Sequence, residues 1–152
     1  LDAKKIVVWN GNAEKLAKKF FPGPLTLILS IKHTALRVKE IKILSANTGE
    51  LGIRQPKNSI ALDLARYLKE PITTTSANMS GEPECYSAED LLKQFGKAKY
   101  KPDIIINVGR LAKRKPSTLV KIENGETIIL RPGPINNKQV FNLLLNTKRL
   151  KY

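Results

Sequence analysis

The sequence predicts an α/β (α+β) fold, because strand-like and helix-like segments alternate along most of its length. Two segments carry this prediction. Leu25–Ile31 is an apolar run interrupted only by Thr26 and Ser30, which is typical of a buried strand. Near the end of the chain, Asn124-Gly125 separates two apolar runs, which is a strong local signal for a β-hairpin.

The first part of the chain predicts a helix between two strands. Lys5–Trp9 is expected to be a strand, and Asn12 is expected to cap the helix that Pro22 and Pro24 end. The apolar face of this helix consists of Ala13, Leu16, Ala17 and Phe20. The polar segment Lys32–Glu50 has no clear periodicity, so we expect a long loop there.

The rest of the chain continues the alternation. Ser59–Lys69 predicts an amphipathic helix with an inner face of Ile60, Leu64, Tyr67 and Leu68. Ser87 and Asp90 resemble a capping box for a helix that stops at Gly96. The remaining expected elements are strands at Gly52–Gln55, Pro71–Thr75 and Asp103–Val108, a hairpin of Thr118–Ile122 and Thr127–Leu130, and a helix at Lys138–Leu145.

Charge is the unusual feature of the composition. The 152 residues suit one domain, but Lys and Arg number 27 against 13 Asp and Glu, which gives a net charge of +14. A surface this basic indicates an anionic partner, such as a nucleotide, a nucleic acid or an acidic membrane face. The longest apolar run is far shorter than the roughly 20 residues of a membrane-spanning helix.

The rare reactive residues exclude several kinds of site. Cys85 is the only cysteine, which excludes an internal disulfide and predicts a reducing, cytoplasmic location. No Cys or His lies near it in the sequence, so we expect no metal site. His33 is the only histidine, which argues against Ser-His-Asp and Cys-His catalysis within this chain.

Two short segments hold a stiff turn and a rigid cation. Pro22-Gly23-Pro24 is either a simple connector between helix and strand or part of a site. Arg54 ends a short strand and is followed closely by Pro56, so its planar guanidinium suits a carboxylate or phosphate. The alternative is a surface arginine that pairs with a local acid such as Glu50.

Two further segments gather small hydrogen-bonding groups. Residues 71–81 pass from an apolar start into three threonines and Ser76, Asn78 and Ser80, which favours a phosphate- or ribose-binding loop over a threonine-rich edge strand with an Asx turn. In the hairpin, a two-residue turn sets Ser117 opposite Pro132, so that Ser117 and Arg131 lie side by side. They form either an anion clamp or a solvated hairpin end.

Together and in this order, these segments resemble the YrdC-like family. The family's patterns are Pro-Gly-Pro-Leu-Thr, Val/Ile-Arg-x-Pro, Thr-Ser-Ala-Asn-x-Ser-Gly, Pro-Ser-Thr and Ile-x-Arg-x-Gly, which stand here at 22–26, 53–56, 75–81, 116–118 and 129–133. The resemblance implies a twisted mixed β-sheet with flanking helices. It also implies one domain over 1–152, with a core to about residue 135 and a C-terminal helix and basic tail over 136–152.

The resemblance implies a nucleotidyltransferase activity. L-Threonine, bicarbonate and ATP, with Mg²⁺ expected, would condense to threonylcarbamoyl-AMP and pyrophosphate for the N6-threonylcarbamoyladenosine modification of tRNA, which a threonylcarbamoyl-transferase complex completes. Arg54 would hold the threonine carboxylate, and Thr74 and Ser117 would also face threonine. The residues assigned to ATP, some through main-chain atoms, are Ser76, Asn78, Arg131, Glu50 and Glu84. No residue is assigned as acid, base, nucleophile or metal ligand.

The chain departs from the family at its beginning. The family's Pro-Thr-Asp/Glu-Thr-x-Tyr-Gly-Leu segment and the following Lys-x-Arg pair are absent, so the chain is expected to correspond to about the C-terminal two thirds of the domain, without its first strands. If the chain were complete, its synthase activity would be weak or absent.

Two alternatives remain open. The excess of lysine and arginine is also consistent with a catalytically impaired YrdC-like fragment that binds RNA directly, or with a solvated lysine-rich surface. The YrdC-like domain of hydrogenase-maturation carbamoyltransferases is a third candidate. One cysteine and a short tail argue against it.

Overall fold

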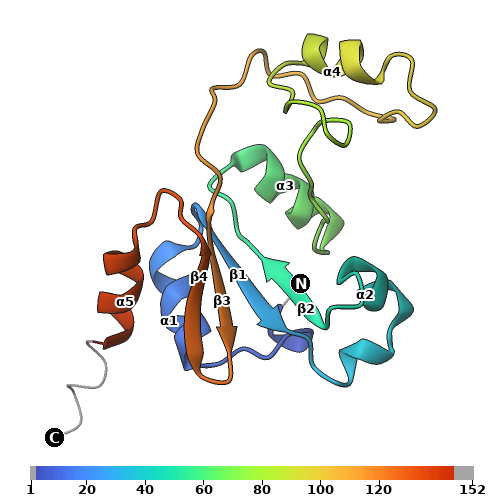
Figure 1. The fold of residues 1–152 in the computed structure, drawn as a ribbon. Coiled ribbons are helices and arrows are strands. Elements are labelled where there is room, and N and C mark those ends of the chain that lie inside the picture. Colours follow the sequence, from blue (N-terminus) through green and yellow to red (C-terminus); the bar gives the residue numbers. More distant parts are fainter. Residues whose placement is uncertain (1–2, 146–152) are drawn as a thin grey trace, which may run out of the picture. The chain divides into compact units, whose positions relative to one another are not determined.

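The computed structural model describes residues 3–145, which form two compact units. One unit comprises residues up to 72 together with those from 115 onward, and the other comprises 73–114. The elements in chain order are η1 (Ala3–Lys5), α1 (Gly11–Phe20), β1 (Leu25–Ser30), η2 (Ala35–Arg37), α2 (Lys39–Leu44), β2 (Glu50–Ile53), α3 (Ser59–Leu68), α4 (Ala88–Phe95), β3 (Thr118–Glu123), β4 (Glu126–Arg131) and α5 (Asn137–Leu145) (Figure 1).

A four-stranded mixed sheet forms the centre of the first unit. Its strand order is β2-β1-β3-β4, with β1 and β3 parallel and the two outer pairs antiparallel (Figure 1). The predicted α/β (α+β) class is therefore confirmed. The sheet forms because β1 and β3 alternate buried and half-buried side chains, so each presents one apolar face.

The apolar core lies on one face of this sheet, against α1 and α5. Leu25, Leu27 and Leu29 of β1 are fully buried there. Their partners in the core are Val7, Ala13, Leu16, Val120, Ile122, Ile135 and Val140. Full burial of one leucine side chain contributes about 1.5–3 kcal/mol, so the three β1 leucines are a major source of this unit's stability.

The first helix begins two residues earlier than the sequence predicts. Asn10, not Asn12, caps α1, because its side-chain oxygen accepts a hydrogen bond from the Ala13 amide at 3.0 Å. The Asn12 amide instead donates to the Gly125 carbonyl and the Thr127 hydroxyl, which ties α1 to the hairpin turn. The helix ends before Pro22 as predicted.

Three predicted strands are wrong. At Lys5–Trp9 the Ile6 and Val7 amides both donate back to the Ala3 carbonyl, so only an isolated bridge from Val7 to Ile31 remains. The segments 71–75 and 103–108 contain no strand. Their β-branched residues have no paired partner strand, and β-propensity alone does not make a strand without one.

The expected loop at Lys32–Glu50 contains two short helical segments, η2 and α2. Neither is two full turns long, so neither could produce a visible helical period in the sequence. The following strand, β2, begins at Glu50 and ends at Ile53, two residues before the predicted limits at each end.

The helix α3 forms as predicted, but its expected inner face is exposed. Asn58 caps it through the Ala61 amide, and the helix ends at Lys69 in the left-handed conformation. Tyr67 is 88% exposed, and Ile60, Leu64 and Leu68 are exposed as well. The amphipathic period therefore predicted the helix but not its burial.

The second unit contains one helix, α4, whose capping was predicted. The Ser87 hydroxyl accepts from the Asp90 amide at 3.1 Å, and the helix ends at Gly96. The Asp90 carboxylate accepts from the Tyr86 amide at 3.2 Å. In a capping box it would accept from the amide of the cap residue, Ser87, which is the next residue along the chain. These contacts hold the pKa of Asp90 below its usual value, chiefly through the bond from the Tyr86 amide.

The predicted hairpin is confirmed, but its register shifts. Val120 pairs with Ile129, whereas Leu119 pairs with Arg131, so Leu130 is an extra residue in β4. Ser117 is therefore not opposite Pro132. Gly133 lies against the backbone of Pro116–Thr118 instead, where an added Cβ would be 2.4 Å from the Thr118 nitrogen.

We predict that Gly133→Ala destabilises the first unit by about 3 kcal/mol, because backbone atoms of Pro116, Ser117 and Thr118 cannot yield to a methyl group. Urea unfolding measures the change. Gly11→Ala is the matched control, since nothing lies within 4 Å of its added Cβ, and it should change stability by no more than about 1 kcal/mol. Equal effects of the two variants would contradict the prediction.

Candidate functional site

One end of the sheet collects the predicted site residues of the first unit. Because β1 and β3 run parallel and β2 and β4 run opposite to them, the starts of β1 and β3 and the ends of β2 and β4 meet at this end. Arg54 follows β2, Ser117 precedes β3 and Arg131 ends β4. We call this group, together with Thr26 of β1, the strand-end cluster.

Ser117 and Arg131 contact each other directly, as predicted. The Arg131 guanidinium donates to the Ser117 carbonyl from Nε at 3.3 Å and from Nη2 at 3.2 Å. Nη2 also lies 3.4 Å from the Ser117 hydroxyl. Ser117 is only 5% exposed whereas Arg131 is exposed, so the cluster has a fixed hydroxyl beneath a cation that faces solvent.

Thr26 belongs to the cluster although no role was predicted for it. Its hydroxyl lies 2.7 Å from the Ser117 hydroxyl. The alternation of β1 contained the signal, because it places Thr26 on the face opposite the buried Leu25 and Leu27. Only the pairing with β3 shows which residue Thr26 meets there.

The Pro-Gly-Pro turn is fixed between two of the motifs. The Gly23 amide donates to the Gln55 carbonyl at 2.8 Å, and the Thr118 amide donates to the Pro24 carbonyl at 2.9 Å. The Arg54 side chain donates to the Gly23 carbonyl at 3.4 Å. The turn therefore connects helix to strand and also orients Arg54, which is exposed.

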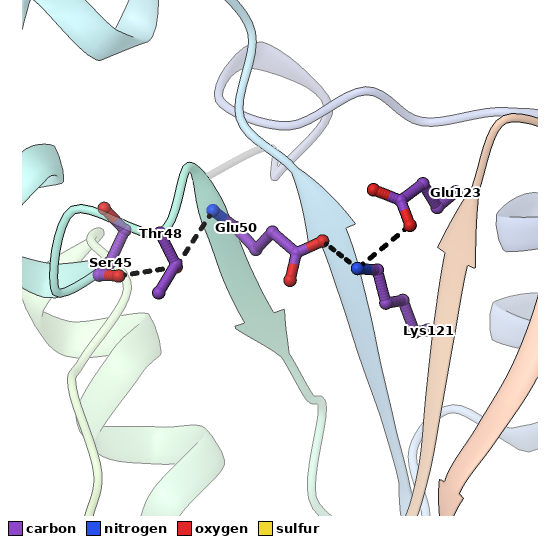
Figure 2. A network of polar contacts seen from close by, with 5 residues as sticks. All are labelled: Ser45, Thr48, Glu50, Lys121 and Glu123. Carbon is purple, nitrogen blue, oxygen red and sulfur yellow. Dashed lines mark hydrogen bonds and ion pairs between the residues drawn. The ribbon is translucent and has the colours of Figure 1, made fainter.

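Glu50 lies at the other end of β2, apart from Arg54. It pairs with Ser30 at the end of β1, and its carboxylate lies 2.8 Å from the Lys121 ammonium (Figure 2). Lys121 also meets Glu123 at 3.0 Å. The alternative in which Glu50 neutralises Arg54 is not what the structure shows.

These two carboxylates raise the pKa of Lys121. The hydrogen bond to Glu50 is the main cause, the bond to Glu123 is second, and desolvation opposes both. A raised lysine pKa means that the stabilisation is fully present below the ordinary value of 10.5 and is lost as the pH rises through the higher folded value.

The second unit holds the other predicted site residues. Thr74 and Ser76 are exposed, and their side chains form no hydrogen bond with the described part of the chain. The Asn78 amide nitrogen donates to the Met79 carbonyl at 3.0 Å and to the Glu82 carbonyl at 2.8 Å. The Glu84 carboxylate accepts from the Tyr86 hydroxyl at 2.7 Å, which raises the pKa of Tyr86.

Asn78 has one group left for a partner. Its side-chain oxygen is buried and has no hydrogen-bond partner among residues 3–145. A buried acceptor without a partner is uncommon and costs roughly 1–3 kcal/mol, so it is consistent with a ligand that donates a hydrogen bond.

No metal cluster and no membrane span occur in the part of the chain that the structure describes. Within residues 3–145, no group of three or more His, Cys, Asp and Glu side chains could hold a metal ion. None of the described helices combines the length and the apolar character that crossing a bilayer requires. The predicted Mg²⁺ therefore has no assigned ligand here.

This arrangement of motifs agrees with a known family. Residues 2–133 match the model of the Sua5, YciO and YrdC family, which carries the description "Telomere recombination", and the chain belongs to that family. The predicted resemblance is confirmed.

Individual relatives agree with the match. A protein of Methanocaldococcus jannaschii is 36% identical over 134 residues, which are 88% of this chain and 58% of that protein. The threonylcarbamoyl-AMP synthase of Pyrococcus abyssi is 33% identical over 129 residues, which are 84% of this chain and 35% of the synthase. The chain thus spans 35% to 58% of the length of these two relatives.

Solved structures confirm the YrdC-like fold. Pyrococcus abyssi Sua5 complexed with L-threonine superposes with a TM-score of 0.77 and 28% identity, and the match covers 95% of this chain and 41% of that one. Escherichia coli YciO superposes with a TM-score of 0.73 and 26% identity, covering 91% and 64% respectively.

We predict that Glu50→Gln lowers the pKa of Lys121 more than Glu123→Gln does, because Glu50 is closer and less exposed. The ¹³Cε resonance of Lys121 reports the titration midpoint in each variant. The stability difference between wild type and Glu50→Gln should persist from neutral pH to about pH 10 and shrink above the pKa of Lys121. A larger effect of Glu123→Gln would contradict this order.

Proposed function

We propose that the chain carries part of the active site of a threonylcarbamoyl-AMP synthase. The strand-end cluster is the observation that carries the proposal, because Arg54, Arg131 and the hydroxyls of Thr26 and Ser117 offer donors for a small amino acid and a phosphate. A relative of known structure was crystallised with L-threonine, and other relatives bear the synthase name.

Arg54 and Ser117 are the proposed threonine ligands in this unit. The guanidinium of Arg54 is exposed and is oriented by the Gly23 carbonyl, so its fork can meet a carboxylate with two parallel hydrogen bonds. The Ser117 hydroxyl, held by Thr26, would face the same substrate. Thr74 of the second unit is the third residue proposed to bind threonine.

Arg131, Ser76 and Asn78 are proposed to bind ATP, with main-chain contacts near Glu50 and Glu84. Arg131 is exposed and forms no ion pair with residues 3–145, so its charge is available to a phosphate. The unpartnered oxygen of Asn78 supports a ligand with a donor group. The carboxylates of Glu50 and Glu84 are engaged with Lys121 and Tyr86, which keeps their charges compensated.

The proposed reaction requires positioning more than acid-base chemistry. The threonine amine nitrogen first bonds to the carbon of bicarbonate, a carbon–oxygen bond breaks and water leaves, which gives N-carboxythreonine. A carbamate oxygen then attacks the α-phosphorus of ATP, the bond to the bridging oxygen of pyrophosphate breaks, and pyrophosphate leaves with the electron pair. Arginines that neutralise the developing charge and hydroxyls that orient the carbamate suffice for such a step. The product would serve tRNA modification through a partner complex.

We predict that pyrophosphate exchange into ATP requires both L-threonine and bicarbonate, and that Arg54→Lys weakens threonine binding about 10- to 100-fold. A lysine keeps the charge but loses the two-pronged contact. Isothermal titration with L-threonine measures binding directly, so that the result does not depend on turnover.

Arg66→Lys is the control for this test, because Arg66 is an exposed arginine of α3 that pairs with Asp63. It should leave threonine affinity unchanged. Exchange that proceeds without threonine, or equal threonine affinity of the Arg54→Lys variant and the wild type, would refute the assignment.

A second candidate function, direct RNA binding, is favoured by exposed cations of the second unit. The candidate phosphate contacts among them are Lys97, Lys99, Lys101, Arg110, Lys113 and Arg114, and Lys115 of the first unit is an exposed candidate as well. Three further candidates in the basic tail, Lys148, Arg149 and Lys151, lie outside the described residues. Tyr100 is 79% exposed among these cations and offers a stacking surface.

If this second function holds, tRNA is retained on filters at low salt and its affinity falls steeply as KCl rises. The double variant Lys97→Ala, Lys101→Ala should then bind more weakly than Lys18→Ala, Lys19→Ala, which removes the same charge from α1. Absence of retention at low salt would exclude RNA binding.

A further inference from the structure

A pocket lies away from the strand-end cluster, between η2, α2 and the turn that leads into β2. Its volume is about 460 Å³, within the range of roughly 300–1,000 Å³ that is usual for small-ligand sites. It is lined by His33, Leu36, Arg37, Lys42, Ser45, Asn47, Thr48 and Gly49. We call it the loop pocket.

The charge of the loop pocket is positive and uncompensated. Arg37 and Lys42 are cations, and the lining contains no carboxylate. Neither forms an ion pair with any residue between 3 and 145. Glu50, the acid that follows the lining in sequence, has its carboxylate on Lys121 (Figure 2). Glu40 lies on the same helix but is not part of the lining.

Hydrogen bonds preform one wall of the pocket. The Ser45 hydroxyl donates to the Lys42 carbonyl at 3.0 Å, and the Thr48 hydroxyl donates to the Ser45 carbonyl at 2.6 Å. Figure 2 shows that Thr48 also accepts from the Glu50 amide, which joins this turn to the ion pairs of the sheet. These bonds hold the Ser45 and Thr48 part of the wall in place without a ligand.

The backbone of this turn is held in an unusual conformation. Ala46 and Asn47 both have positive φ angles, 49° and 60°, which residues other than glycine adopt rarely. The Ile31 amide donates to the Gly49 carbonyl at 2.8 Å and anchors the end of the turn to β1. The Asn47 side chain forms no hydrogen bond with the described residues, so its amide remains a free donor on the wall.

We propose that the loop pocket binds a phosphoryl group, as inorganic phosphate, as pyrophosphate or as the phosphates of a nucleotide. An arginine fork, a lysine ammonium and free amide and imidazole donors surround one space, which suits an anion with several acceptor oxygens. The proposal does not use the strand-end cluster, because none of its residues lines the pocket.

His33 provides a direct test, since it is the only histidine and it lines the pocket. The ring proton resonances of His33 are followed by NMR at constant pH while phosphate, pyrophosphate or ATP is added to the 152-residue chain. Potassium chloride at the same ionic strength is the reference. A saturable shift with phosphate or pyrophosphate, and none with chloride, is the expected result. Saturation with ATP alone would identify the nucleotide as the source of the phosphoryl group.

Two variants separate the pocket from the general positive charge. Lys42→Ala should weaken binding about 10-fold, because it removes a charged donor from the lining. Lys39→Ala removes the same charge from the same helix outside the lining, and should change affinity by less than about twofold. Arg37→Lys keeps the charge and tests the guanidinium fork.

The proposal is overturned if none of the three ligands shifts His33 saturably, or if Lys39→Ala weakens binding as much as Lys42→Ala does. Backbone amide spectra of each variant establish that the sheet is intact. A failure here leaves the threonine-binding test of Arg54 unaffected, since that test uses a different ligand and a different end of the sheet.

Discussion

The parallel pairing of β1 with β3 is the contact on which the rest of the first unit depends. It aligns Leu25 with Thr118 and Leu29 with Ile122, so that the apolar faces of both strands form one core against α1 and α5. The same pairing brings Thr26 beside Ser117, although the two are 91 residues apart in the sequence. The register of β1 against β3 therefore determines both the core and the candidate site.

Positive charge is not neutralised at one end of this sheet, whereas toward the other end it is paired with carboxylates. At the strand-end cluster, Arg54 and Arg131 donate only to carbonyl and hydroxyl oxygens of the described chain, so their positive charge is not neutralised. Toward the other end, Lys121 lies between two carboxylates (Figure 2). Strand spacing of about 4.8 Å places the backbones of β2 and β4 roughly 14 Å apart, with β1 and β3 between them.

The cations that give the net charge of +14 have different proposed roles at different sites. Two arginines are proposed to meet substrates at the strand-end cluster, and Arg37 and Lys42 line a separate pocket with a preformed wall. Both places combine cations with hydroxyl groups that hydrogen bonds hold in place. A preorganised donor costs little reorganisation on binding, which distinguishes such places from a lysine-rich surface that is simply solvated.

The sequence by itself determined the features that depend on neighbours within a few positions. These are the hairpin turn at Asn124-Gly125, the Ser87 cap, the extent of β1 and the motifs that identify the family. Tertiary structure decided the rest. The extra residue in β4, the contact of Thr26 with Ser117 and the pairing of Glu50 with Lys121 all join distant segments. Turns and helix caps form from hydrogen bonds between residues a few positions apart. A strand register, or an ion pair between distant segments, exists only after the sheet has brought its partners together.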